Sequence, residues 1–443
     1  MTRLFGTDGV RGLANVELTA DLALALSRSA ARLLTAHGGD GARPAAVVGR
    51  DPRPSGELLE AAVCAGLASA GVDVRRLGVV PTAAVAHLVV QTGAALGVMI
   101  TASHNPMPDN GIKFFGPDGF KLSDETEDAV EAGLDGDLEA RAGLPAGAAV
   151  GRMLPDEDLV EGYLTHVLAT LPNRADGVHV VVDAANGAAT RVVPEVYERA
   201  GARVTVINNR TDGEAINADC GATHLEGLRA SVVAHGADLG LAHDGDADRC
   251  LAVDAHGEVV DGDAILAVLA LSLRERQALA GETVAATVMS NLGFHKAMKA
   301  HGISVAETAV GDRYVLERMR AEGLTLGGEQ SGHVILLEHA TTGDGILTGL
   351  HLLSRVAGTA PLAELAAVMT RLPQVLVNVA VHDKSVAMET LRPLVAAAES
   401  QLDGDGRVLV RPSGTEQLVR VMVEAPTAER AQQIADGIAS AIR

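Results

Sequence analysis

A serine, a histidine and a lysine stand near one another in one short stretch of the sequence. Ser103 and His104 follow the apolar run 94–100, which predicts a buried strand, and Lys113 comes ten residues after Ser103. Ligands of open α/β sheets bind where the strands end. A serine at such a place can carry an acyl or phosphoryl group, whereas many loop serines only hydrogen-bond to the nearby backbone. Ser103 is therefore a candidate nucleophile.

Three aspartates alternate with small residues in the segment 244–249, which reads Asp-Gly-Asp-Ala-Asp-Arg. Side chains at alternate positions of an extended segment point to one side, so we expect the carboxylates of Asp244, Asp246 and Asp248 to converge. Such oxygens suit Mg²⁺ or Ca²⁺ better than a soft metal. An EF-hand is excluded because Arg249 and Ala255 stand where its loop needs Gly and Glu. An acidic turn exposed to water is the alternative explanation.

Arginines and glycine-rich loops supply candidate contacts to phosphate and sugar. Arg249 follows the three aspartates, and Arg11 lies in the opening loop 5–12, whose glycines let the backbone approach an anion. The loop 327–333 carries Glu, Gln, Ser and His side chains that can hydrogen-bond to a small polyol. The segment 411–416 adds hydroxyls and a guanidinium group for phosphate. A metal, an arginine and a nucleophilic hydroxyl are the components of phosphoryl transfer, although each loop is also explained as an ordinary turn.

Alternating strands and helices position these motifs. Apolar runs predict strands, and helical periodicity with a cap at Thr19 predicts helices between them. The expected strands are 44–51, 72–80, 94–100, 178–183, 202–208 and 283–289, and the expected helices are 19–37, 56–71, 188–201 and 294–301. This alternation predicts three similar α/β domains with mixed, mostly parallel sheets. The tail differs, because its strands at 374–381, 407–410 and 418–424 and its helices at 384–402 and 427–442 predict a smaller α+β domain.

Chain length and composition limit the possible partners. The 443 residues are too many for one core, and we expect four domains around a central cleft, at 1–150, 151–255, 256–371 and 372–443. A net charge of −21 argues against nucleic acid and anionic membranes. The scattered Cys64, Cys220 and Cys250 indicate reduced thiols. Neither a signal peptide nor a membrane span is expected, so we predict a cytoplasmic protein.

Taken together and in order, the motifs resemble those of the α-D-phosphohexomutase superfamily. The resemblance covers essentially the whole chain. It rests on FGTDGVRG at 5–12, TASHNP at 101–106, DGDADR at 244–249, VGDRYV at 310–315, GGEQSGH at 327–333 and RPSGTE at 411–416. The first motif and the glutamine in GEQSGH favour the members that act on glucosamine phosphates over the phosphoglucomutase and phosphomannomutase relatives.

The resemblance implies roles for individual residues. Ser103 would be phosphorylated and would both donate and accept the phosphoryl group, and Mg²⁺ would be held by an oxygen of that phosphoserine together with Asp244, Asp246 and Asp248. Arg11 and Arg249 would neutralise the transferring group. Lys113, with His104 beside it, would be the general acid or base, which requires neighbouring cations to lower its pKa. The sugar-binding loop would comprise Glu329, Gln330, Ser331, Gly332 and His333, and the site of the non-reacting phosphate would comprise Arg411, Ser413, Gly414, Thr415 and Arg420.

The implied reaction converts glucosamine 6-phosphate into glucosamine 1-phosphate through a 1,6-bisphosphate, which also serves as activator. Its product would feed UDP-N-acetylglucosamine and peptidoglycan synthesis. The expected partner is a small sugar phosphate, with no nucleic acid or membrane, and a homodimer is a further possibility. The basic residues of the motifs would converge on the cleft, over which a mobile fourth domain closes. The alternatives are a mutase acting on glucose or mannose phosphates, a hexose-bisphosphate synthase or phosphatase, and a sensor without activity.

Overall fold

The computed structural model describes residues 3–35, 43–134, 143–413 and 416–442. The chain forms two compact units. The first contains Met1–Val288 and Ala306–Ala366, and the second contains Met289–Val305 and Ala367–Arg443.

The first sheet of the first unit carries the candidate nucleophile. It has six strands in the order β1 (Val10–Leu13), β5 (Asp109–Phe115), β4 (Leu96–Ile100), β2 (Ala45–Arg50), β3 (Asp73–Val79) and β6 (Met153–Pro155). The strands from β4 to β6 in this order pair in parallel, whereas β1 and β5 are antiparallel. Every residue of β4 is buried, as its apolar sequence requires.

Helices connect these strands, as the sequence predicts. They are α1 (Ala20–Thr35), α2 (Ser55–Ser69), α3 (Thr82–Thr92) and α4 (Asp124–Ala132). The predicted cap is confirmed, because the backbone N–H of Leu22 donates to Thr19 Oγ1 at 3.2 Å. Helix α3 ends at Gly93, whose φ of 64° is the left-handed conformation that glycine adopts readily.

Two further sheets complete the α/β part of the chain. One runs β11 (Val259–Val260), β10 (Cys250–Asp254), β9 (Leu239–His243), β7 (His179–Asp183), β8 (Arg203–Ile207), and the other runs β13 (Ser304–Thr308), β12 (Thr283–Thr287), β14 (Leu326–Gly328), β15 (Val334–Leu336). Their helices are α6 (Val160–Ala169), α7 (Ala189–Arg199), α8 (Glu226–His235), α9 (Gly262–Glu275), α11 (Asp312–Glu322), α12 (Gly345–Gly358) and α13 (Leu362–Ala366). Short 3₁₀ turns lie at Gly147–Ala149, Glu157–Leu159, Gly221–Thr223 and Ala280–Glu282.

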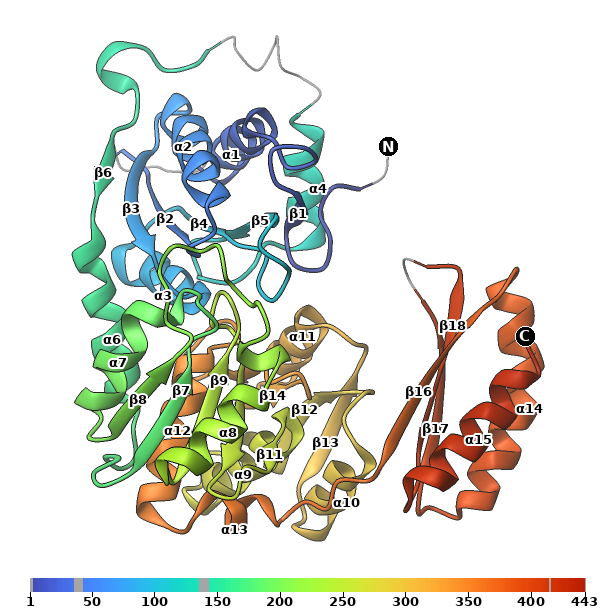
Figure 1. Cartoon of the computed structure of the whole chain (residues 1–443). Helices are drawn as coiled ribbons and strands as arrows, with labels where there is room; N and C mark the ends of the chain where they lie inside the picture. Colours follow the sequence, from blue (N-terminus) through green and yellow to red (C-terminus); the bar gives the residue numbers. More distant parts are fainter. Residues whose placement is uncertain (1–2, 36–42, 135–142, 414–415, 443) are drawn as a thin grey trace. The chain divides into compact units, whose positions relative to one another are not determined.

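The second unit is a small α+β layer. Its antiparallel sheet has the order β16 (Gln374–Ala380), β18 (Leu418–Glu424), β17 (Arg407–Pro412). Figure 1 shows α14 (Lys384–Leu402) and α15 (Ala428–Ser440) on one face of this sheet, and α10 (Leu292–Ala300) also belongs to this unit. Apolar side chains such as Leu391 and Val421 fill the space between the sheet and the two helices.

The predicted fold class is confirmed, with three α/β sheets and a smaller C-terminal α+β part. The boundaries at 150, 255 and 371 stay a prediction, and part of the expected linker after Leu134 lies outside the described residues. Among the described helices, none combines the length and the apolar character that crossing a membrane requires.

Candidate active site

Ser103 lies three residues after the end of the buried strand β4 and is itself 1% exposed. Its φ of 51° is left-handed, an uncommon conformation for a residue other than glycine. The hydroxyl Oγ donates to Asp244 Oδ2 at 2.6 Å and lies 3.3 Å from Nδ1 of His104. The structure therefore brings the candidate nucleophile against the first of the three aspartates.

The three aspartates converge as predicted, but the backbone reason given for it is wrong. Ligand oxygens of Asp244, Asp246 and Asp248 lie within 4.8 Å of one another. The segment that carries them is a turn between β9 and β10, not an extended strand. Ala247 has a left-handed φ of 58°, which folds the chain back and brings the carboxylates together.

The carboxylates have free oxygens in a buried place. Oδ1 of Asp246 and Oδ1 of Asp248 are buried and have no hydrogen-bond partner among the described residues. A buried carboxylate oxygen without a partner is costly, and a hard cation would satisfy both oxygens. The donor set therefore fits Mg²⁺.

Gly245 allows the turn 244–249 to pack closely against the loop that carries Ser103. A Cβ atom at this position would lie 2.5 Å from the carbonyl oxygen of Ser103. Only glycine avoids that clash, so the close approach of the two loops depends on it.

Lys113 is surrounded by carboxylates rather than cations. It is 1% exposed, and its Nζ lies 2.9 Å from Asp8 Oδ2, 2.9 Å from Asp246 Oδ2 and 3.5 Å from Asp248 Oδ2. Burial by itself lowers the pKa of this ammonium, but the three carboxylates outweigh it and raise the pKa above its usual range. The lowered pKa that the acid or base role was taken to require is therefore not found, because carboxylates from distant parts of the chain lie beside this ammonium.

Burial and neighbouring charges raise the pKa of some titratable groups in the site and lower the pKa of others. Burial, with Asp248 and Asp246 beside it, raises the pKa of Asp244 well above its ordinary value. Burial acts in the same direction on Asp248, but Lys113 and His333 hold the pKa of that carboxyl well below its ordinary value. Burial, with positive charge nearby, lowers the pKa of His104 to about 4, so its imidazole is neutral at pH 7.

The two predicted arginines lie at the same site. Arg249 Nε is 4.0 Å from Asp244 Oδ2 and 4.0 Å from Asp248 Oδ1. Arg11 is on β1, opposite Gly111 of β5, and it pairs with Asp8. Nε of Arg11 and Nε of Arg249 are both buried and make no hydrogen bond within the described part of the chain, so both can still donate to an anion.

The glycine-rich loop of the third sheet reaches this cluster through His333. Its Nδ1 lies 3.6 Å from Asp248 Oδ2, and its Nε2 accepts a hydrogen bond from Gly343 N at 3.1 Å. Glu329 Oε1 accepts from the backbone N–H of Gly311 at 3.0 Å.

Elsewhere in this loop, Gln330 Nε2 is 3.5 Å from Asp261 Oδ2. Gly332 adopts a φ of 90°. Ser331 Oγ is buried and has no hydrogen-bond partner within the described residues.

The predicted phosphate residues lie in the second unit. Arg411 of β17 stands directly opposite Arg420 of β18. Burial, and then Arg420, lower the pKa of Arg411. Ser413 is buried, and its carbonyl oxygen accepts from Lys384 Nζ at 2.7 Å. Gly414 and Thr415 lie outside the described residues.

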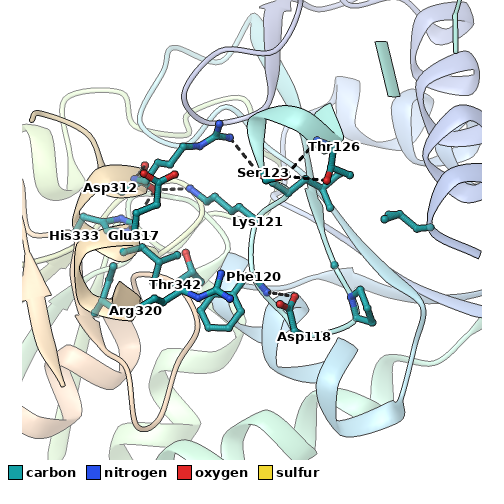
Figure 2. A pocket seen from close by; sticks show the side chains of 17 residues that line it. Asp118, Phe120, Lys121, Ser123, Thr126, Asp312, Glu317, Arg320, His333 and Thr342 are labelled. Carbon is teal, nitrogen blue, oxygen red and sulfur yellow. Dashed lines mark hydrogen bonds and ion pairs between the residues drawn. The ribbon is translucent and has the colours of Figure 1, made fainter. Parts of the chain in front are cut away.

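Sequence reasoning missed an ion-pair network behind Lys113. Lys121 pairs with both Asp8 and Asp312, and Figure 2 shows Lys121 pointing toward Asp312 with His333 alongside. Lys121, Asp312 and His333 line one side of a cavity of about 310 Å³. Asp8 and Asp312 stand inside the motifs FGTDGVRG and VGDRYV, which was the available signal.

Comparison with known proteins agrees with this arrangement. The chain matches the four domains of phosphoglucomutase/phosphomannomutase: alpha/beta/alpha domain I over residues 2–141, domain II over 161–257, domain III over 261–372 and the C-terminal domain over 376–441. Phosphoglucosamine mutases of Rhodococcus opacus and Thermobifida fusca are 60% and 62% identical, over 100% of this chain and over 99% and 98% of their own lengths.

A solved structure matches as well. A phosphoglucomutase/phosphomannomutase family protein from Burkholderia thailandensis has a TM-score of 0.84 and 25% identity, over 100% of this chain and 97% of that one. The chain therefore belongs to the phosphoglucomutase/phosphomannomutase family, the α-D-phosphohexomutases that its motifs predict. Within this family it belongs with the phosphoglucosamine mutases, since the relatives of that name match its full length.

Proposed function

We propose that this protein interconverts glucosamine 6-phosphate and glucosamine 1-phosphate by phosphoryl transfer through Ser103. The observation that carries the proposal is the contact between Ser103 Oγ and Asp244 in a buried group of three aspartates that keeps unpartnered oxygens. The chain's close similarity to phosphoglucosamine mutases supports the choice of substrate.

The phosphoryl group moves between Ser103 and the sugar. In the first half-reaction the bond from phosphorus to Ser103 Oγ breaks and a bond to a sugar hydroxyl oxygen forms, while the proton of that hydroxyl is lost and Ser103 Oγ gains one, so that the serine is left as a hydroxyl. The resulting 1,6-bisphosphate returns its other phosphoryl group to Ser103 in the second half-reaction. Free bisphosphate would activate the enzyme by phosphorylating Ser103.

The aspartates and an oxygen of the phosphorylated Ser103 would hold Mg²⁺. Bound Mg²⁺ neutralises charge on the transferring group. We assign Arg11 and Arg249 to the same group, because their Nε atoms are free to donate within the described residues.

Two groups are assigned to proton movement. Lys113 enters the reaction as an ammonium ion, because its pKa is raised. We assign it the proton that passes to the departing oxygen, since that oxygen becomes strongly basic as its bond to phosphorus breaks. Neutral His104 lies near enough to accept a proton from Ser103 Oγ, at 3.3 Å. Together the two residues supply one proton donor and one proton acceptor for the transfer.

The two remaining motifs are assigned to recognition. We propose that the loop with Glu329, Gln330 and Ser331 binds the amino sugar, since Ser331 Oγ keeps an unsatisfied hydrogen-bonding group. Arg411 and Arg420 are assigned to the non-reacting phosphate, because the two arginines are direct cross-strand neighbours and adjacent guanidinium groups favour an anion beside them. We also propose a cytoplasmic enzyme that supplies glucosamine 1-phosphate for UDP-N-acetylglucosamine and cell-wall synthesis.

The test compares substrates. Purified enzyme with Mg²⁺ and a trace of hexose 1,6-bisphosphate is assayed for kcat/KM on glucosamine, glucose and mannose 6-phosphates. A preference for glucosamine 6-phosphate supports the proposal. Equal kcat/KM on glucose or mannose 6-phosphate would instead indicate a mutase that acts on those sugar phosphates. Net release of bisphosphate would indicate a synthase, and net release of inorganic phosphate would indicate a phosphatase.

A further inference from the structure

Arg53 is a fully buried arginine between β2 and α2 that no part of the proposed chemistry uses. Its side chain donates hydrogen bonds to backbone carbonyl oxygens in the segment 103–109, which begins with Ser103. Nη2 donates to the carbonyl oxygens of Ser103 at 3.0 Å and Asn105 at 2.7 Å, and Nη1 donates to those of Pro106 and Asp109. With Nε bonded to Asp51 at 2.9 Å, all five N–H groups of the guanidinium have a partner.

Asp51, the carboxylate partner of Arg53, is linked through Thr101 to the backbone N–H of Ser103. Asp51 Oδ2 accepts from Arg53 Nε and also from Thr101 Oγ1 at 2.7 Å. Thr101 Oγ1 in turn accepts from the backbone N–H of Ser103 at 2.9 Å. The amide and the carbonyl of Ser103 are therefore both held, one through Thr101 and the other by Arg53 directly.

A second donor reaches the same carbonyl oxygens from another part of the chain. Asn217 Nδ2 donates to Ser103 O at 2.8 Å and to Asn105 O at 3.1 Å. Two side chains thus hold the turn in which Ser103 has its left-handed φ of 51°. A strained backbone persists where the surrounding contacts over-determine it.

We propose that Arg53 is a positioning residue that, with Asp51 and Asn217, holds the Ser103 turn so that Oγ faces Asp244. The inference rests on the proposed function, in which Ser103 carries the phosphoryl group. Arg53 itself does not touch the reacting atoms. A lysine cannot replace it, because an ammonium has three donors on one atom and cannot reach carbonyl oxygens spread over seven residues, from 103 to 109.

The kinetic test uses Arg53→Lys, with Arg355→Lys as the matched control. Arg355 lies on α12 and is also largely buried. Its Nη1 and Nη2 donate to the two carboxylate oxygens of Glu275, at 2.5 Å and 2.7 Å. Small displacements of a reacting group cost roughly 100-fold in rate, so we expect kcat of Arg53→Lys to fall by roughly that factor while KM changes by less than about threefold. The control keeps the wild-type kcat.

A milder variant covers the case in which Arg53→Lys fails to fold. Asn217 has a φ of 59°, which glycine adopts without strain, so Asn217→Gly removes the amide donor and leaves the backbone undisturbed. We expect kcat to fall by roughly tenfold with KM little changed. Wild-type kcat in both folded variants, or in Asn217→Gly alone if Arg53→Lys does not fold, overturns the proposal.

Hydrogen exchange measures the turn without reference to activity. In each folded variant, we expect faster exchange in the peptide covering residues 101–111 and unchanged exchange in distant peptides. Uniformly faster exchange would show a general loss of stability and would overturn the positioning role. If wild-type enzyme shows no mutase activity but the local change is present, the proposed function fails and the positioning role of Arg53 stands.

Discussion

Ser103 has a conformation and a set of partners that a loop serine with a purely local role does not need. Its left-handed backbone directs Oγ to a carboxylate 141 positions further along the chain, at 2.6 Å. The same hydroxyl also lies 3.3 Å from the imidazole of His104. These contacts favour a nucleophilic role for Ser103 over that of a loop serine that only hydrogen-bonds to the nearby backbone.

Replacing Ser103 with Ala removes the proposed phosphoryl carrier. We expect mutase activity to disappear. The free energy of unfolding, measured by thermal unfolding, should change by no more than about 1–2 kcal/mol, the contribution of one hydrogen bond. Ser27→Ala is the control, because Ser27 is equally buried and lies in α1. Activity of Ser103→Ala at the wild-type rate would refute the assignment.

Asp246→Asn tests the metal site. One oxygen of Asp246 accepts from Thr82 Oγ1 at 2.6 Å and from Lys113 at 2.9 Å, which leaves Oδ1 for a cation. Loss of the charge should raise the Mg²⁺ concentration for half-maximal activity by at least about tenfold. Titration of activity with Mg²⁺ measures this shift.

The control for this titration is Asp254→Asn. Asp254 is also buried, but it accepts backbone N–H groups at the end of β10, outside the three aspartates. Its replacement should leave the Mg²⁺ requirement unchanged. An unchanged requirement in Asp246→Asn as well would remove Asp246 from the metal site.

At the scale of elements, the paired strands β17 and β18 place two like charges side by side, one of which, on Arg420, also pairs with Glu416 at 3.2 Å. Arg411 and Arg420 are direct cross-strand neighbours, and like charges so placed destabilise a sheet. A bound phosphate would reverse this effect by taking hydrogen bonds from both. The arrangement is therefore understandable as a site for an anion rather than as a stabilising feature.

Arg411→Met should weaken binding without slowing the chemical step. A contact to the non-reacting phosphate is made equally in the ground state and in the transition state, so KM for glucosamine 6-phosphate should rise by roughly 10–100-fold with kcat little changed. Arg392→Met on α14 is the control, because Arg392 is exposed on the helix. A fall in kcat at constant KM would contradict the assignment of Arg411 to phosphate binding.

At the scale of the whole molecule, buried and half-buried histidines make the fold sensitive to acid. Burial, with His339 and Arg276 nearby, lowers the pKa of His351 to about 3, and burial with His166 nearby lowers that of His87 to about 4. In the unfolded chain both titrate near 6.5. The unfolded chain therefore binds more protons between the two pKa values, and stability falls as the pH falls through that range.

His351→Gln should reduce this loss. With a folded pKa of about 3, His351 alone accounts for about 2 kcal/mol of the stability lost between pH 7 and pH 5. Urea unfolding of the variant should therefore show a smaller difference between these two pH values. His235→Gln, at an exposed position, should leave the difference unchanged. An equal loss in wild type and His351→Gln would contradict the sign or the size of the shift.

The elements themselves follow from local patterns. The apolar run before Ser103 became the fully buried β4, and the cap at Thr19 starts α1. Such signals lie within a few residues of one another, so the sequence shows them directly. The turn at 244–249 shows the limit, because the aspartates converge through the left-handed Ala247 and not through an extended backbone.

The sequence by itself determined the fold class, the nucleophile candidate and the three aspartates, since each rests on residues close together in the chain. Only the tertiary structure showed that carboxylates surround Lys113, and that Arg53 and Asn217 both hold the carbonyl of Ser103. Their partners lie 50 or more positions apart along the chain, as with Arg53 and Ser103. The pKa of a buried group and the conformation of a buried turn depend on which charges and donors the folded chain brings beside them, and one-dimensional spacing does not contain that information.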